Sequence, residues 1–211
     1  MKALITGGRG GIGRAIAAAL GDAEVVTLDL PEFDAGDPAT WRALEGEFDA
    51  AFLNAGVVTG EAEIGALSDE QYRRAVGANL DGVVFGVREC AARLMPNGGA
   101  IVATASLAGL TATPMDPIYA LTKHAVVGFV RSVAPQLAER GIRISALCPG
   151  FTDTAIVVDE IRGELRAPLM EPSFVAQAAL EALNDPEPGG AWVAQPNRIV
   201  RFRFPNIPGP R

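Results

Sequence analysis

The chain of 211 residues contains very few of the side chains that bind metal ions. It has one histidine, His124, and two cysteines, Cys90 and Cys148, which lie far apart in the sequence. A structural zinc site needs closely spaced cysteine or histidine ligands, and these three residues do not supply them. We therefore expect no metal site.

Positive charge and long apolar runs are also scarce. The chain has 18 Lys and Arg against 25 Asp and Glu, which gives a net charge of −7. This balance argues against nucleic acid or an anionic membrane surface as a partner. Neither a membrane-spanning run nor a signal peptide is predicted, because Met1 directly precedes an apolar strand-like segment. We expect a soluble, cytoplasmic protein.

The residues that are abundant are typical of a packed α/β protein. About half of the chain is apolar (49%) and glycine is frequent (24 residues), and this length suits one well-buried domain, predicted over residues 1–211. Strand-like runs alternate with helical patterns, as in a parallel sheet of βαβ units. We predict strands over 2–8, 23–30, 49–56, 99–106, 142–150 and 190–195. We predict helices over 10–20, 41–48, 67–95, 116–141 and 172–185.

Two segments have no predicted helix or strand. Residues 152–171 are polar, and we expect them to be mobile. The tail, residues 201–211, alternates Arg with Phe and ends in prolines. The sequence assigns the tail no role.

One pair of side chains suggests chemistry. The chain has only two tyrosines and two lysines, yet Lys123 follows Tyr119 by four residues in a predicted helix. At this spacing the two side chains share one helix face. They are either an ordinary surface pair or an acid/base pair. In the second case, an ammonium about 4 Å from the phenol stabilises phenolate by roughly 4 kcal/mol, which lowers the tyrosine pKa by about three units.

A glycine-rich turn, "TGGRGGIG" at 6–13, joins the first strand to the first helix. It is either a plain connection or a cradle for a pyrophosphate at the helix N-terminus. Asp29 ends the second strand, where its carboxylate can bind ribose hydroxyls and repel the 2′-phosphate of NADP. Arg9 in the turn favours the opposite choice. We predict NAD as the cofactor, with NADP as the alternative.

Six stretches in order resemble the short-chain dehydrogenase/reductase family over nearly the whole chain. They are "TGGRGGIG" (6–13), "LNAG" (53–56), "NLDG" (79–82), "IVATASLAG" (101–109), "YALTK" (119–123) and "CPGFTDT" (148–154). Within the family, residues 117–129 and 147–156 are most similar to the 15-hydroxyprostaglandin dehydrogenase branch. The resemblance implies a single doubly wound parallel sheet of Rossmann type.

The resemblance also implies four catalytic residues. Tyr119 would be the general acid/base, and Lys123 would lower its pKa and bind the nicotinamide ribose. Ser106 would orient and polarise the substrate oxygen. Asn79 would hold a water molecule that links Lys123 to solvent.

Further residues follow from the same resemblance. The cofactor contacts are predicted to be Gly7, Arg9, Gly11, Ile12, Gly13, Asp29, Asp34, Ala35, Asn54, Ala55, Gly56, Tyr119, Lys123, Pro149, Gly150, Thr152 and Thr154. The substrate contacts are predicted to be Ser106, Leu107, Asp116, Tyr119 and Phe151. Together with Ile156 and Val157, these indicate a hydrophobic alcohol or ketone as substrate.

Departures from the family pattern include three that bear on the fold and the site. The segment between the second strand and "LNAG" is short, so we expect one helix of the usual fold to be missing. Asp116 replaces a glutamine that contacts substrate in the prostaglandin branch, and its charge would disfavour an acidic substrate. The short loop after Thr154 predicts an open or small site.

Three functions are compatible with these residues. The first is an NAD-dependent oxidoreductase of secondary alcohols or ketones. The second is an NADPH-dependent ketone or 3-oxoacyl reductase, and the third is a catalytically idle NAD-binding protein. By analogy with the family, helices near 68–95 and 117–139 would pair between subunits of a dimer or tetramer.

Overall fold

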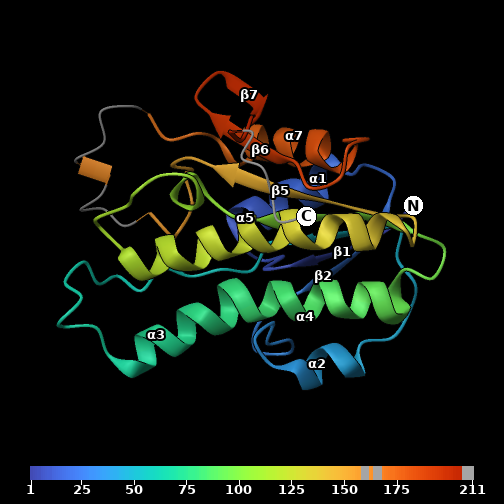
Figure 1. The fold of residues 1–211 in the computed structure, drawn as a ribbon, viewed down its shortest axis with the longest axis horizontal. Helices are drawn as coiled ribbons and strands as arrows, with labels where there is room; N and C mark the ends of the chain where they lie inside the picture. Colours follow the sequence, from blue (N-terminus) through green and yellow to red (C-terminus); the bar gives the residue numbers. More distant parts are fainter. Residues whose placement is uncertain (158–161, 164–167, 206–211) are drawn as a thin grey trace.

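The computed structural model describes residues 1–157, 162–163 and 168–205. One seven-stranded sheet has the order β2-β1-β3-β4-β5-β6-β7, and every neighbouring pair is parallel except β6 and β7 (Figure 1). Its strands are β1 (Lys2–Thr6), β2 (Glu24–Leu28), β3 (Ala50–Leu53), β4 (Gly99–Thr104), β5 (Ile142–Pro149), β6 (Ala191–Gln195) and β7 (Arg198–Arg201). The predicted Rossmann-type sheet is confirmed.

Helices cover both faces of the sheet. They are α1 (Gly11–Ala19), α2 (Pro38–Ala43), α3 (Asp69–Val76), η1 (Gly77–Asp81), α4 (Gly82–Glu89), η2 (Cys90–Leu94), η3 (Leu107–Gly109), α5 (Pro117–Ala138) and α7 (Pro172–Leu183). None of these described helices is long and apolar enough to cross a membrane.

Alternation along the strands builds two apolar layers. Leu4 and Leu53 belong to one buried cluster, whereas their neighbours Ile5 and Phe52 belong to the other. Successive strand residues point to opposite faces, so a strand buried on both sides is a continuous apolar run. This explains why "ALI" and "AAFL" contain no polar residue.

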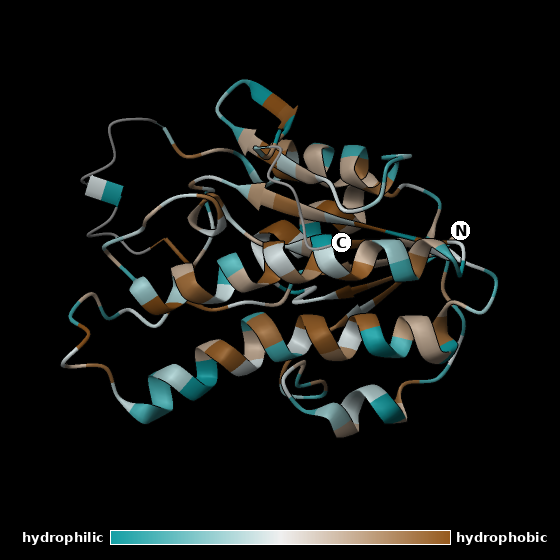
Figure 2. Ribbon diagram, in the orientation of Figure 1, coloured by the Kyte–Doolittle hydropathy of each residue, from teal (hydrophilic) through white to brown (hydrophobic). Residues whose placement is uncertain are grey.

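Different helices complete each layer. Val87 of α4 and Val130 of α5 join the cluster of Leu4, while Ile16 of α1 and Val175 of α7 join the other. In Figure 1 the first pair of helices accordingly lies along one side of the sheet and the second pair along the other. The polar α3 continues through η1 into the largely apolar α4 (Figure 2). The sheet is therefore doubly wound.

The predicted helix over 67–95 is present but contains two π-helical turns, η1 and η2. Ser68 and Gln71 form the capping box that begins it, with Ser68 accepting a hydrogen bond from the Gln71 N–H at 3.1 Å. Asn79 lies within η1. π-turns often occur at functional sites because they re-aim side chains.

The predicted helix over 41–48 is wrong. The helix in this segment, α2, starts at Pro38 and ends at Ala43. Asp37 caps it by accepting a hydrogen bond from the Ala39 N–H at 2.7 Å, and proline suits the first helical turn. α2 is the one helix between β2 and β3 in the described chain, and the expectation that one helix of the usual fold is missing here stays a prediction.

The last strand was not predicted. Asn197, with φ of 61°, makes the turn that returns the chain as β7 against β6. Asp185 anchors this hairpin by accepting hydrogen bonds from Trp192 Nε1 (2.8 Å) and Arg201 Nε (2.9 Å). The remaining tail from 206 to 211, like 158–161 and 164–167 of the segment expected to be mobile, lies outside the described residues.

Trp41 anchors the shortened segment and generates a stability prediction. It is fully buried, donates from Nε1 to the Ala35 carbonyl at 2.9 Å, and packs edge-on against Phe33. We expect Trp41→Ala to lower the free energy of unfolding by about 3–5 kcal/mol, measured by urea denaturation. Trp41→Phe, which keeps most of the packing, should cost clearly less. Equal losses in the two variants would contradict this account.

Candidate functional site

One cleft of about 680 Å³ lies at the carboxyl ends of the parallel strands. Ligands bind at this edge of open α/β sheets, because the connecting loops open there. The predicted site residues that line it are Gly7, Gly11, Ile12, Asp29, Asp34, Ala35, Asn54, Ala55, Gly56, Ser106, Leu107, Asp116, Tyr119, Lys123, Pro149, Gly150, Phe151, Thr152, Thr154, Ile156 and Val157. Arg9, Gly13 and Asn79 are not among the residues that line it.

The glycine-rich turn is shaped by close backbone approach. Gly7 has φ of +64°, and a Cβ at Gly13 would lie 2.3 Å from the Gly7 carbonyl oxygen. A Cβ at Gly11 would lie 2.8 Å from Cγ2 of Thr154 across the cleft. No side chain caps α1, so the N–H groups of its first turn are available to an anionic group.

A fixed carboxylate stands at one end of the cleft. Asp29 accepts hydrogen bonds from the Arg9 N–H (2.8 Å) and the Leu30 N–H (2.9 Å). Both donors come from the main chain, so they orient the carboxylate without removing its charge. Asp34, further along, accepts a hydrogen bond from the Gly36 N–H at 2.8 Å.

Ser106, Tyr119 and Lys123 meet at the other end of the cleft. Ser106 lies two residues after the end of β4 and caps η3, where its Oγ accepts a hydrogen bond from the Ala108 N–H at 3.1 Å. Tyr119 and Lys123 come from successive turns of α5. The Lys123 ammonium is buried, donates to the Thr104 carbonyl at 2.8 Å, and lies 5.5 Å from the Tyr119 ring centroid.

Burial shifts the pKa values of this pair. Burial raises the pKa of Tyr119 above its usual value; a hydrogen bond with Ser106 lowers it, and the Asp116 carboxylate raises it further. Burial lowers the pKa of Lys123 to about 8. Burial is thus the largest influence on the Tyr119 pKa, and the expected lowering of this pKa by Lys123 stays a prediction.

Asn79 forms hydrogen bonds to both the loop after β3 and α5. Its Oδ1 accepts from the Val57 N–H at 2.7 Å, and its Nδ2 donates to the Val57 carbonyl (2.9 Å) and to Thr122 Oγ1 (3.0 Å). A Cβ at Gly56 would lie 3.1 Å from Asn79 Oδ1 and 3.3 Å from Lys123 Nζ. Asn79 is thus a positioning residue, and its role as a water ligand stays a prediction.

Asp116 caps the helix that carries Tyr119. It is 5% exposed and accepts hydrogen bonds from the Tyr119 N–H (2.8 Å), the Thr59 N–H (2.7 Å), Thr59 Oγ1 (2.7 Å) and the Gly60 N–H (3.2 Å). These donors occupy both oxygens of Asp116, which favours a structural role for this residue over the substrate contact that we predicted. An N-cap aspartate before proline was a signal available in the sequence.

The mouth of the cleft beside Tyr119 is apolar. Met115, Phe151 and Ile156 line it with side chains 42%, 43% and 39% exposed. Sequence reasoning missed Met115 and its neighbours Thr111, Ala112, Thr113 and Pro114, all of which line the cleft. Their position between Ser106 and Tyr119 could have identified them, because a loop joining two site residues must border the site.

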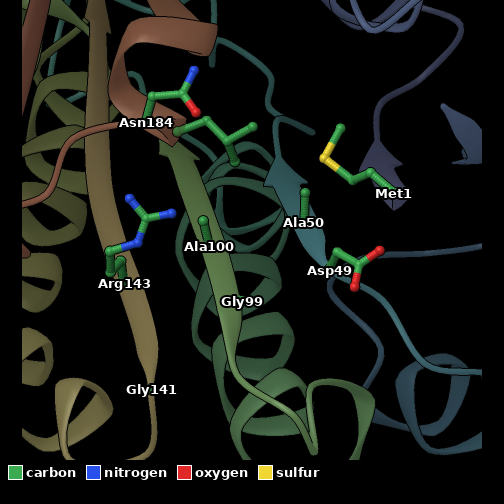
Figure 3. A pocket seen from close by; sticks show the side chains of 9 residues that line it. Met1, Asp49, Ala50, Gly99, Ala100, Gly141, Arg143 and Asn184 are labelled. Atoms are coloured by element: carbon green, nitrogen blue, oxygen red, sulfur yellow. The ribbon is translucent and has the colours of Figure 1, made fainter. Parts of the chain in front are cut away.

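A second, smaller crevice of about 220 Å³ lies at the opposite end of the strands (Figure 3). Asp49 stands on one side of it, and Arg143 and Asn184 stand on the other. The Asp49 carboxylate is already bonded to the Lys2 N–H at 2.7 Å, and Arg143 donates to the Asp185 carbonyl at 2.9 Å. Neither group points to a ligand.

Removing the Asp116 carboxylate tests its capping role. We expect Asp116→Ala to lower the free energy of unfolding by roughly 2–4 kcal/mol, because a helix cap and several buried hydrogen bonds are lost. Thr59→Val, which removes one of the donors, should cost about 1 kcal/mol. Urea denaturation measures both, and an unchanged midpoint for Asp116→Ala would exclude the proposed clamp.

The lowered pKa of Lys123 predicts a pH dependence of stability. Between pH 8 and the ordinary lysine value of about 10.5, the folded chain loses this proton while the unfolded chain keeps it, so stability rises with pH. We expect the free energy of unfolding of wild type to rise by about 1 kcal/mol relative to that of Lys123→Met between pH 7 and pH 9. The thiols titrate in both proteins, so their effects largely cancel in this comparison. Parallel curves of stability against pH for the two proteins would refute the prediction.

Comparisons with known proteins identify relatives over most of the chain. A family model described as "Enoyl-(Acyl carrier protein) reductase" matches residues 12–194. The chain is 35% identical over 150 residues to the 3beta-hydroxysteroid dehydrogenase of Mediterraneibacter gnavus, covering 68% of this chain and 54% of that protein. It is 34% identical over 146 residues to the cyclohexanol dehydrogenase of an Acinetobacter species, covering 66% of this chain and 58% of that protein.

Solved structures share the fold. A 3-oxoacyl-[acyl-carrier protein] reductase from Brucella melitensis with bound NAD superposes with a TM-score of 0.74 at 30% identity, covering 86% of this chain and 83% of that chain. The chain spans about half the length of the curated relatives it matches. Because the family match runs from the glycine-rich turn to the last parallel strand, the chain belongs to the short-chain dehydrogenase/reductase family.

Proposed function

We propose that the protein is an NAD-dependent oxidoreductase that interconverts a secondary alcohol and its ketone. The observation that carries this proposal is the placement of Ser106, Tyr119 and Lys123 at one end of a single cleft, with the fixed Asp29 carboxylate at the other. An elongated dinucleotide between these ends would put its reactive ring beside a proton donor.

The cleft fits a dinucleotide. Gly7 and Gly11 leave no side chain between the turn and the cleft, and the uncapped start of α1 suits a pyrophosphate. Asp29 suits the adenosine ribose, and the buried Lys123 ammonium suits the second ribose. When bound, NAD would supply the hydride acceptor or donor.

Side chains of the protein itself would transfer the proton to and from the substrate oxygen. A raised pKa keeps the phenol of Tyr119 protonated at neutral pH, so that in reduction it can donate its proton to the carbonyl oxygen. Alcohol oxidation reverses this transfer and requires the phenolate form of Tyr119, which accepts the hydroxyl proton. Ser106, which hydrogen-bonds the phenol, orients the same substrate oxygen. Asp116 and Asn79 hold the catalytic helix and the loop after β3 in register around this point.

The substrate is proposed to be uncharged and apolar. Leu107, Met115, Phe151 and Ile156 line the mouth, and the nearby Asp116 carboxylate is occupied by main-chain and threonine donors. The names of the hydroxysteroid and cyclohexanol dehydrogenases to which the chain is similar support this choice. The closer resemblance to the 15-hydroxyprostaglandin dehydrogenase branch stays a prediction.

The two alternatives have less support. An NADPH-dependent reductase would place a phosphate beside the fixed Asp29 carboxylate, which repels it. A catalytically idle binder has no need for Ser106, Tyr119 and Lys123 at one point. Pairing of the helices near 68–95 and 117–139 between subunits also stays a prediction, and light scattering tests it directly.

Tyr119→Phe tests the mechanism, because it removes the transferable proton and little else. We expect turnover of cyclohexanol or a 3β-hydroxysteroid, read at the nicotinamide absorbance, to fall by about 10²–10⁴-fold. The dissociation constant for NAD⁺ should change by less than about twofold.

The chain supplies a matched control in its other tyrosine. Tyr72 is 43% exposed on α3 and does not line the cleft, so Tyr72→Phe should leave turnover unchanged. If Tyr119→Phe retained wild-type turnover, the proposed mechanism would be wrong. Binding of NAD⁺ by wild type without turnover of any alcohol or ketone would instead favour the idle binder.

A further inference from the structure

Arg9 is the one feature of the glycine-rich turn that argues for NADP, and its contacts decide how it acts. Its Nη1 donates to the Leu30 carbonyl at 2.7 Å and lies 2.9 Å from Oε2 of Glu32. Its main-chain N–H is bonded to Asp29. The guanidinium therefore extends past the Asp29 carboxylate and pairs with a second acid three residues further along the chain.

We propose that Glu32 is a cofactor-specificity residue that withholds Arg9 from the 2′-phosphate of NADP. This inference rests on the proposed function, because it concerns the cofactor of the same cleft. Asp29 and Glu32 carry two negative charges against the single positive charge of Arg9. The adenosine end of the cleft thus keeps a net negative charge, which favours a ribose hydroxyl over a phosphate.

The local structure keeps these groups in place. Gly8 donates from its N–H to the Leu28 carbonyl at 3.4 Å, and Arg14 donates to the Arg9 carbonyl. These bonds fix the main chain of Arg9 beside the end of β2. Its side chain therefore starts next to the carboxylate that is expected to bind the ribose, within reach of any group attached there.

The Glu32 carboxyl group is negatively charged at neutral pH. A hydrogen bond that the carboxylate accepts from its own main-chain N–H, and then the Arg9 guanidinium, hold the pKa of Glu32 below its ordinary value. Arg9 and Glu32 are 61% and 67% exposed. Such a pair contributes little to stability, so its effect should appear in ligand choice rather than in folding.

Removing the charge of Glu32 should release Arg9. In Glu32→Gln the guanidinium loses its ionic partner and can turn its remaining donors toward a phosphate, with which it forms charge-assisted hydrogen bonds. We expect the dissociation constant for NADP⁺, measured by calorimetric titration, to fall about three- to tenfold. The constant for NAD⁺ should change by less than about twofold.

A double-mutant cycle shows whether the effect acts through Arg9. In an Arg9→Gln background, Glu32→Gln should no longer improve NADP⁺ binding. Glu24→Gln is the matched control, since Glu24 is 65% exposed and paired with Lys2 at the far end of β2. It removes the same charge and should leave NADP⁺ binding unchanged.

The outcomes separate this inference from the proposed function. An unchanged NADP⁺ constant in Glu32→Gln, or an equal gain in the Arg9→Gln background or in Glu24→Gln, would overturn the role of Glu32 while leaving NAD⁺ binding and turnover as evidence for the enzyme. If wild type bound neither dinucleotide, both proposals would fail. A gain confined to Glu32→Gln with Arg9 intact supports the inference.

Discussion

A buried ammonium is the constraint around which the site is organised. Lys123 is 2% exposed, and a charge so far from water is costly unless polar groups compensate it. The Thr104 carbonyl at the end of β4 provides one hydrogen bond, and the Gly56 backbone lies close to the ammonium. The pKa of Lys123 stays below its ordinary value because these polar groups do not fully offset the cost of burying the charge. A second ligand for the ammonium, such as ribose hydroxyls, would relieve it, so the site is built to bind.

Two buried polar side chains of the site, Asn79 and Asp116, join elements that are distant in the sequence. Asn79 connects the π-turn η1 to the loop after β3, and Asp116 connects the same loop to the start of α5. Both side chains are buried and their hydrogen bonds run mostly to main-chain groups. Buried polar networks of this kind fix one arrangement, because any shift leaves donors or acceptors without partners. The position of Tyr119 is therefore set by the loop of residues 57–60 as much as by its own helix.

The sequence predicts those parts of the fold and cleft that depend on local spacing. Apolar runs fix the parallel strands, and the i,i+4 spacing of Tyr119 and Lys123 places both on one helix face. The tyrosine pKa was not predictable in this way, since its direction depends on how much solvent the folded chain removes. The boundaries of α2 were missed because the apolar pattern of 41–48 outweighed the cap of Asp37 and Pro38. β7 is a four-residue edge strand whose partner is set by a turn and by Asp185.

The shortened segment after β2 explains why the adenosine end depends on a few exposed charges. β2 is an edge strand of the sheet, and within the described residues no further strand pairs with it on its outer side. The segment is held from within by Phe33 and Trp41, whose rings meet edge to edge in the core. That anchor fixes the loop of residues 29–35 across the cleft, but it leaves Arg9 and Glu32 at the surface. Under the proposed role of Glu32, selection between ribose hydroxyls and a phosphate at this edge would depend on charge balance, since both Arg9 and Glu32 are largely exposed.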